Sequence, residues 1–303
     1  MNGSTMAPRL TGARSRHGRG RLLRRKLTSR IMLGLAGLTA VLAVLPLAWI
    51  IIYVVQAGLP ALTPEFFTNL PTPVGVPGGG IINAIVGSAI TVGLGLLMAA
   101  PVGTLVAIYA TANAERRIGT VIRFATDTLS GVPSIVMGIF AYTIVVVPQR
   151  HFSALAGGVV LAFIMLPIVV RSTEEMLKLV PSSLREASLA LGAPEWRTWW
   201  NVLLPAAWNG ILTGLMLAIA RAGGEAAPML FTAFGNPFMS VSLDQPIATP
   251  PHTIYTYAIS PYEDWRAKAW ATALVLIVLV LALNVTARYV TGRRARKLGT
   301  VTR

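Results

Sequence analysis

The feature that most constrains this chain is a series of long apolar runs without a charged residue. Residues 31–55 are 25 consecutive positions free of Asp, Glu, Lys and Arg, and residues 81–110 are a second such run. About 20 mostly apolar residues in a helix cross the hydrocarbon core of a bilayer, which is roughly 30 Å thick. With 54% hydrophobic and only 12% charged residues, the sequence predicts a polytopic membrane protein and not a water-soluble globule.

About six transmembrane helices are expected, and the fold class is therefore all-α, because an isolated span satisfies its backbone hydrogen bonds only as a helix. Gly131 and Pro133 fall within the third span and predict a kink there. The predicted spans are residues 31–55, 81–110, 123–147, 152–170, 205 to beyond 220, and 269–287.

The basic residues predict the topology. Lys and Arg number 26 against 11 Asp and Glu, and they gather in both tails and in the loops after the second and fourth spans. The two long loops, residues 56–80 and 234–264, contain no Lys or Arg. By the positive-inside tendency, both termini are expected in the cytoplasm, with the chain spanning the cytoplasmic (inner) membrane several times. Phe66 and Phe67 are expected to anchor the first long loop at the membrane interface.

Three regions follow from this reading. Residues 1–30 carry nine Lys or Arg and no acid, which predicts a disordered basic cytoplasmic tail. A signal peptide is the alternative, but the 25-residue run after the tail is longer than a signal-peptide core. Residues 31–290 form the transmembrane domain, and residues 291–303 form a second basic tail. Charge concentrated in tails and short loops does not predict a nucleic-acid partner.

Several chemistries are not expected. The chain has no Cys, which excludes disulfides and thiolate sites. Its three His residues are too scattered to predict a metal site. No Gly-x4-Gly-Lys-Ser/Thr loop occurs, so the chain is not expected to hydrolyse ATP. No catalytic residues are predicted.

Between the fourth and fifth spans lies a polar segment, residues 181–204, that predicts a helix, a turn and a second helix. Ser183 and Glu186 have the spacing of a capping box, in which each side chain accepts from a free backbone N–H of the other residue. Gly192 suits the left-handed position just past a helix end, and Pro194 suits the first turn of the next helix.

Arg221 and Glu225 are the most informative charged pair. A helix rises about 1.5 Å per residue, so Arg221 is expected roughly 24 Å beyond Pro205, in the outer half of the membrane. Charges at that depth normally face protein or a water-filled path. The pair therefore predicts an anion pathway lined by Arg221 and oriented by Glu225, or equally a structural ion pair between helices.

Three weaker candidates have structural alternatives of equal or greater weight. Arg171 can be a gate residue or an arginine that extends to the cytoplasmic surface. Ser134 can donate to an anion or to the backbone. Asp127 is expected to pair with Arg123, four residues earlier on the same helix face.

The polar loop also carries a family resemblance. Its residues Glu186-Ala187-Ser188, Gly192, Val202 and Leu204-Pro205 resemble the EAA-x3-G-x9-I-x-LP loop of ABC importer permeases, with Ser188 and Val202 departing from the pattern. The resemblance implies the ABC importer type I permease fold. It also implies that Glu186, Ala187, Ser188, Gly192, Leu204 and Pro205 belong to a coupling loop that contacts ATPase subunits.

A second resemblance concerns the spans. Residues 221–228 (Arg-x-x-Gly-Glu-x-Ala-Pro), 131–140 and 79–103 resemble the A-type permease subunit of phosphate-specific ABC importers. This implies import of inorganic phosphate, a second homologous permease subunit, two ATP-binding subunits that hold ATP and Mg, and an extracytoplasmic phosphate-binding protein. The chain itself would bind no cofactor and would contact membrane lipid.

Two other functions stay open. Sulfate and molybdate permeases share the Arg-x-x-Gly-Glu part of the motif, although the Ala-Pro at residues 227–228 favours phosphate. A self-sufficient anion carrier driven by an ion gradient would also account for Arg221 and Glu225, but such a carrier would not need the structured polar loop.

Overall fold

The computed structural model describes residues 16–299, with side chains described for residues 24–286 and 289. All regular elements in this part of the chain are helical; the only β-type contact among them is an isolated bridge between Phe234 and Ile247. The chain divides into two parts, Met1–Tyr53 and Val54–Arg303. The all-α architecture predicted from the sequence is confirmed.

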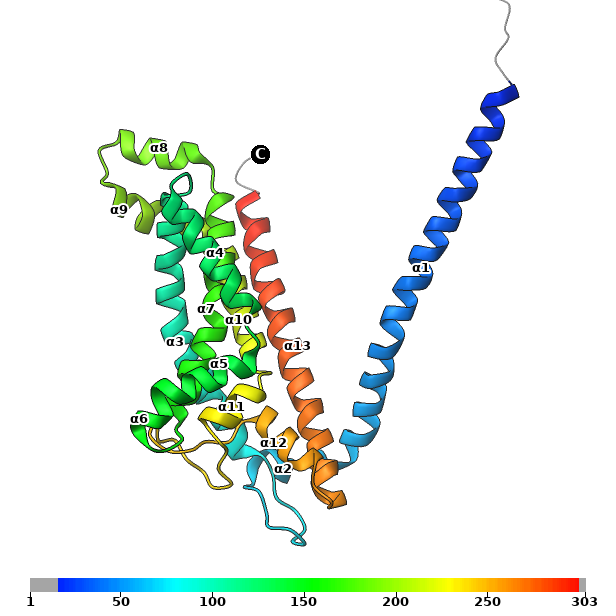
Figure 1. Cartoon of the computed structure of the whole chain (residues 1–303), viewed down its shortest axis with the longest axis vertical. Coiled ribbons are helices and arrows are strands. Elements are labelled where there is room, and N and C mark those ends of the chain that lie inside the picture. Colours follow the sequence, from blue (N-terminus) through cyan, green and yellow to red (C-terminus); the bar gives the residue numbers. More distant parts are fainter. Residues whose placement is uncertain (1–15, 300–303) are drawn as a thin grey trace, which may run out of the picture. The chain divides into compact units, whose positions relative to one another are not determined.

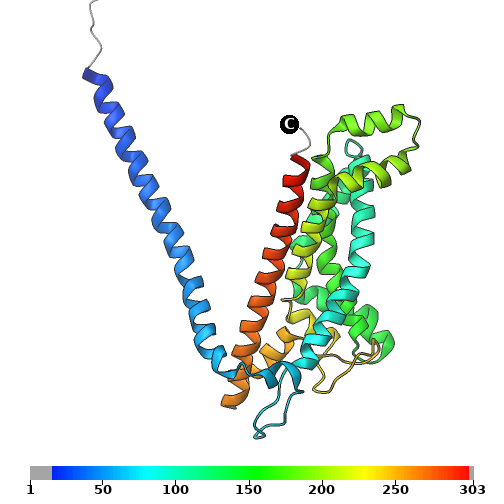
Figure 2. The same ribbon diagram turned by 180° about the vertical axis from the view of Figure 1, so that it is seen from behind.

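Five of the described helices are long and apolar enough to cross a membrane, and a bent pair of helices brings the number to six. Within the second part of the chain, α3, α7, α10 and α13 run along a common direction (Figure 1, Figure 2). The five spanning elements are α1 (Arg16–Gly58), α3 (Ile82–Ala112), α7 (Ala154–Lys178), the continuous run of α9, η3 and α10 (Glu195–Ala222), and α13 (Glu263–Gly299).

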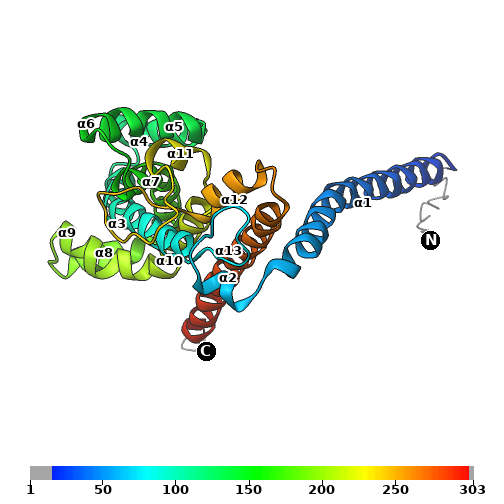
Figure 3. The same ribbon diagram turned by 90° about the horizontal axis from the view of Figure 1, so that it is seen from below.

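Helix α7 is the centre of the bundle. It contacts α3, α10, α4 and α5, and Figure 3 shows it surrounded by these elements when the bundle is viewed from one end. Glycines allow α3 and α7 to approach closely: a Cβ added to Gly158 would lie 2.6 Å from Leu94 Cβ, and one added to Gly95 would lie 2.9 Å from Leu161 Cβ. Inside a bilayer the hydrophobic effect does not hold helices together. Small residues let the helix backbones approach closely, and the van der Waals contacts that result stabilise the pair.

The third predicted span is a bent pair. Helix α4 (Arg117–Gly131) ends before Pro133, and α5 (Ser134–Ala141) continues through the π-helical η2 (Tyr142–Val146) into α6 (Val147–Gln149). The two halves meet at 100°. The kink predicted at Gly131 and Pro133 is confirmed, and it is a full break between two helices that together are long and apolar enough for one span. Val132 precedes a proline and is extended (φ −71°, ψ 129°), which ends the helix at Gly131.

The predicted disordered tail, residues 1–30, also needs correction. Helix α1 already begins at Arg16, so residues 16–30 are helical; residues 1–15 lie outside the described residues. No Pro occurs between Arg16 and Ile31, and a helix propagates readily from an existing span because each added residue gains a hydrogen bond.

Short helices build the two ends of the second part of the chain. Helices α8 (Ser182–Ala190) and α9 (Glu195–Thr198) lie at one end, and α2 (Pro64–Thr68) and α12 (Pro250–Ala258) lie at the other (Figure 1). Phe66 of α2 is 1% exposed and packs with Ile81, Ala84 and Ala271. It is a core residue, so its predicted role as an interfacial anchor is wrong. Phe67 is 40% exposed.

Candidate functional site

Helix α8 forms the centre of the polar loop, residues 181–204. It begins at Ser182 after Pro181, whose φ of −57° and ψ of 134° lead the chain into the helix. Ser183 therefore lies inside the first turn, and no side chain caps this end. The predicted capping box of Ser183 and Glu186 is wrong, because Pro181 already fixes the start of the helix and has no N–H to be capped.

The end of α8 agrees with the prediction. Gly192 has φ +81°, its N–H donates to Leu189 O at 2.9 Å, and the N–H of Ala193 donates to Ser188 O at 3.2 Å. These two bonds form a Schellman motif, which satisfies the last free carbonyls of the helix. Pro194 then serves as the N-cap of α9 and not, as predicted, as a first-turn residue.

Two side-chain contacts join α8 to α9. Ser188 Oγ lies 2.8 Å from Thr198 Oγ1, and Arg185 Nη2 lies 2.8 Å from Glu195 Oε1. Thr198 leads through the π-helical η3 (Trp199–Leu203) directly into α10 (Leu204–Ala222), so α8, α9 and α10 form one mechanically connected unit.

The predicted coupling residues divide into exposed and buried positions. No residue of α8 is buried, and Glu186 and Ala187 are exposed. Leu191 is 89% exposed. Leu204 is buried at 7% and packs in a cluster with Leu177 and Trp199, and Pro205 is exposed at the start of α10. The outer surface of α8 is thus free, and the Leu204 end is anchored in the bundle.

Arg221 and Ser134 lie on the same small cavity. Arg221 is in the last turn of α10, its side chain is 56% exposed, and Ser134 is the first residue of α5. The cavity has a volume of about 90 Å³; Ser130 is its remaining hydrogen-bonding side chain, and the other lining residues are apolar. The fold thus brings together Arg221 and Ser134, which are 87 positions apart in the sequence.

Glu225 lies beside this cavity without lining it. It is in the short connection between α10 and α11 (Ala227–Thr232), its side chain is 17% exposed, and its Oε1 lies 3.8 Å from Arg221 Nε. This distance brings opposite charges together but is too long for a hydrogen bond. The predicted pairing of Arg221 with Glu225 is therefore present as a loose ion pair that leaves donors of the guanidinium available.

Arg171 lies elsewhere, on α7, and is not among the residues that line the Arg221 cavity. Its Nε lies 3.0 Å from Glu175 Oε1, and its Nη1 lies 3.9 Å from Asp127 Oδ1. The sequence grouped Arg171 with Arg221 and Ser134 as anion-pathway candidates, but the structure brings only the latter two to one cavity.

Sequence reasoning missed a buried carboxylate. Glu174 is 1% exposed, and its Oε1 lies 2.6 Å from both Arg123 Nε and Lys178 Nζ. The predicted pair of Arg123 with Asp127 is wrong, because Arg123 pairs instead with Glu174 on α7. Glu174 and Lys178 are four residues apart, so their pairing on one helix face could be predicted. Arg123 is 51 positions from Glu174, and no local pattern predicts that contact.

Among the described residues, no group of three or more His, Cys, Asp or Glu could hold a metal ion. Residues 99–296 match the family described as binding-protein-dependent transport system inner membrane component. The chain belongs to this family. Its membership makes it a permease component of the inner membrane that crosses the bilayer several times.

Individual relatives agree with this membership. A Haemophilus influenzae protein named "Phosphate transport system permease protein PstA" is 43% identical over 265 residues, which are 87% of this chain and 94% of that protein. A Xylella fastidiosa protein of the same name is 46% identical over 239 residues, 77% of this chain and 82% of that protein.

A solved structure supports the fold. The structure titled "Inward facing conformations of the MetNI methionine ABC transporter: CY5 native crystal form" has a TM-score of 0.56 at 19% identity, covering 71% of this chain and 94% of that chain. At this identity the likeness concerns the fold alone. The permease fold predicted from the sequence is confirmed.

Proposed function

We propose that this chain is a permease subunit of an ATP-driven importer of inorganic phosphate and forms half of the anion pathway together with a second homologous permease subunit. The observation that carries the proposal is its identity of 43% over 87% of the chain to a protein named as a phosphate transport permease. Identity of this extent supports a shared substrate in a way that the fold alone does not.

The chemistry of the Arg221 cavity supports an anion as substrate. Its cationic guanidinium, the hydroxyl groups of Ser130 and Ser134, and the N-terminus of the eight-residue helix α5 meet at the cavity. Guanidinium groups bind phosphate oxygens through charge-assisted hydrogen bonds, and a helix N-terminus favours negative charge. Glu225, at 3.8 Å, limits the strength of binding at Arg221, and the ion must be released for transport to continue.

The loop of residues 181–204 would transmit the energy of ATP hydrolysis. ATP and Mg would be bound by two partner ATPase subunits, and this chain would have no catalytic residues of its own. Helix α8 has no buried residue and is tied to α9 and α10. A movement of an ATPase surface against Glu186 and Leu191 would therefore move α10, which carries Arg221.

The distribution of basic residues supports one orientation. The α8 end would face the cytoplasm, together with both termini, and the α2 and α12 end would face the extracytoplasmic phosphate-binding protein. Membrane lipid would surround the spans.

The test is uptake of labelled phosphate into membrane vesicles containing the chain with or without the copurifying ATPase subunits. The proposal expects uptake that requires both ATP and those subunits. Uptake by the chain alone on a proton or sodium gradient would replace it with a secondary carrier. Competition by sulfate and molybdate belongs in the same assay: if either displaces phosphate at equal concentration, the substrate assignment is wrong, although the ABC permease assignment stands.

A further inference from the structure

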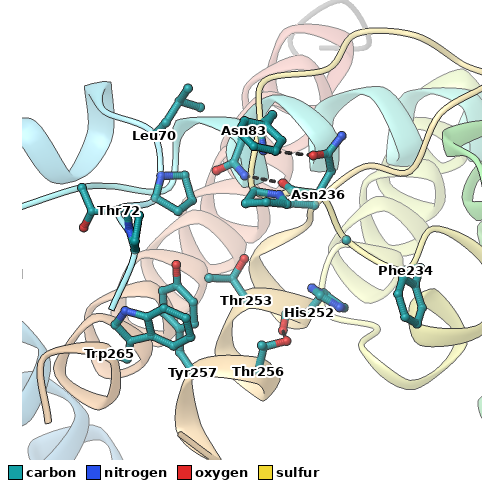
Figure 4. A pocket seen from close by; sticks show the side chains of 16 residues that line it. Leu70, Thr72, Asn83, Phe234, Asn236, His252, Thr253, Thr256, Tyr257 and Trp265 are labelled. Carbon is teal, nitrogen blue, oxygen red and sulfur yellow. Dashed lines mark hydrogen bonds between the residues drawn. The ribbon is translucent and has the colours of Figure 1, made fainter. Parts of the chain in front are cut away.

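A second and larger cavity (Figure 4) is lined partly by α12, which lies at the end of the bundle opposite α8 (Figure 1). Its volume is about 640 Å³, within the range of roughly 300–1,000 Å³ that is typical of small-molecule sites. Its walls come from segments far apart in sequence: residues 70–73, the start of α3, residues 234–238, α12 and the start of α13. Nothing in the proposed anion pathway uses this cavity.

The lining residues contain no Asp, Glu, Lys or Arg. An ion placed here would lose its hydration without gaining a partner of opposite charge, which is strongly unfavourable. This separates the site from the Arg221 cavity and favours an uncharged ligand over phosphate.

Aromatic rings form much of the wall. The rings of Tyr257 and Trp265 stack with centroids 4.6 Å apart and an interplanar angle of 28°, and Figure 4 shows them side by side below the loop of residues 70–73. Phe234 and Phe238 line another part of the cavity, and both are exposed. Such surfaces favour an apolar ligand body that removes them from water.

The cavity also contains uncharged hydrogen-bonding groups without partners. The ring nitrogens of His252 form no hydrogen bond to any described residue, and burial lowers the pKa of this imidazole. His252 is therefore neutral near pH 7 and offers one donor and one acceptor.

Asn83 and Trp265 add two further unpaired groups. Asn83 is 4% exposed; its Nδ2 donates to Asn236 O at 2.7 Å, but its Oδ1 has no partner. Trp265 Nε1 is likewise buried without a partner. Buried polar groups are nearly always paired in native structures, and each exception calls for an explanation.

We propose that this cavity binds an uncharged amphiphile, with an apolar body against Tyr257 and Trp265 and one hydroxyl-bearing end at His252. The ligand chemistry is the same for a neutral lipid of the adjacent leaflet and for a soluble aromatic or aliphatic alcohol. The proposal does not depend on the identity of the transported ion.

The test is photolabelling of the full chain, copurified with its partner subunits in lipid nanodiscs, by a diazirine derivative of octanol. Adducts are located by mass spectrometry. The proposal expects adducts concentrated on residues 70–73, 234–238, 252–257 and 265. It also expects unlabelled 2-naphthol, but not 2-methoxynaphthalene, to reduce these adducts strongly, because only the naphthol can donate a hydrogen bond. Competition by monooleoylglycerol instead of naphthol would identify a neutral lipid as the source.

A cavity-filling variant provides the second arm. Thr256 lines the cavity and is half-buried, so Thr256→Trp is expected to reduce labelling by about tenfold, which corresponds to a loss of roughly 1.4 kcal/mol of binding. Val278→Trp is the matched control on α13, where Val278 is exposed and lines none of the cavities. Adducts spread evenly over the lipid-facing helices would overturn the proposal. So would labelling that occurs in the isolated chain but disappears in the assembled complex, since a partner protein would then fill the cavity.

Discussion

Arg221 is the residue on which the proposed anion pathway depends. Replacement by Gln keeps hydrogen-bonding groups but removes the charge. A hydrogen bond to a charged group contributes about 1.5–3 kcal/mol, so phosphate uptake by Arg221→Gln should fall by about 10- to 100-fold. The measurement is ATP-driven uptake in vesicles, with assembly of the complex checked by copurification.

Arg266→Gln is the matched control for Arg221→Gln. Arg266 is likewise a partly exposed arginine near a carboxylate, with Nη2 3.7 Å from Glu263 Oε1, but it lines none of the described cavities. Its replacement should leave uptake unchanged. Equal uptake in both variants would make the Arg221–Glu225 pair structural.

Glu174 is expected to contribute to stability and not to transport. Its carboxylate, 2% exposed, lies 2.6 Å from both Arg123 Nε and Lys178 Nζ and balances one of their two positive charges. Breaking a buried ion pair costs about 3–5 kcal/mol, and since both cations here are partly exposed we expect about 2–3 kcal/mol for Glu174→Gln.

The neighbouring Glu175 supplies the comparison for Glu174. Its carboxylate pairs with Arg171 at 3.0 Å while 55% exposed, and exposed pairs contribute at most about 1 kcal/mol. Thermal unfolding of the two Glu→Gln variants in detergent should therefore show the larger loss at position 174. Equal losses would mean that the Glu174 contacts do not stabilise the fold.

His252 should make the stability of the chain depend on pH. Burial lowers its pKa from the ordinary 6.5, so the folded state binds a proton less readily than the unfolded state. The stabilisation from a neutral His252 is fully present above the ordinary pKa and is lost as the pH falls below it. The melting temperature should drop between about pH 7 and pH 5, and less so in His252→Gln. An identical drop in both proteins would assign the effect to other groups.

At the scale of the elements, the turn after α8 carries the main prediction. Gly192 has φ +81° and open space around it, so Gly192→Val strains its own backbone without a clash against other residues and should cost about 1–2 kcal/mol locally. We expect the angle between α8 and α9 to relax and phosphate-stimulated ATP hydrolysis to lose its coupling to uptake. Gly93→Val, in open space on α3 without a positive φ, is the control. Normal coupling in Gly192→Val would exclude a rigid turn as the coupling element.

Some elements of the fold are encoded by residues close to them in the sequence. The apolar runs, the end of α8 at Gly192 and the break at Pro133 follow from residues within one turn of each feature, and all three were predicted. The 100° bend and the inward position of Phe66 depend on packing against distant helices. The sequence predicts a break at Pro133, but not the direction in which the chain bends. It likewise does not show on which side Phe66 packs.

The same limit applies to the sites. Arg221 and Glu225 are neighbours on the chain, so their proximity could be predicted. The contact of Arg123 with Glu174 and the shared cavity of Arg221 and Ser134 join different helices, and no local pattern encodes them. The uncharged cavity of Figure 4 is lined by five separate segments, and no pattern within any one segment predicts a binding site.

At the scale of the second part of the chain, residues 54–303, three kinds of surface follow one another along the bundle. Helix α8 presents an exposed surface at one end, the cationic Arg221 cavity lies at the break between α10 and α11, and the uncharged cavity lies at the other end. The exposed α8 end fits a subunit that contacts an energy source on one side of the membrane.

The proposed orientation can be tested cleanly because the chain contains no Cys. Ser183 on α8 is exposed, and Val241 in the loop at the opposite end is 69% exposed. In intact spheroplasts, a membrane-impermeant maleimide should label Val241→Cys, whereas Ser183→Cys should react only after permeabilisation. The wild-type chain gives the background, and a permeant maleimide applied to both variants confirms that each thiol is reactive. Labelling of Ser183→Cys in intact spheroplasts would invert the topology and place α8 beyond the reach of any cytoplasmic ATPase, which would contradict the coupling function proposed for the loop of residues 181–204.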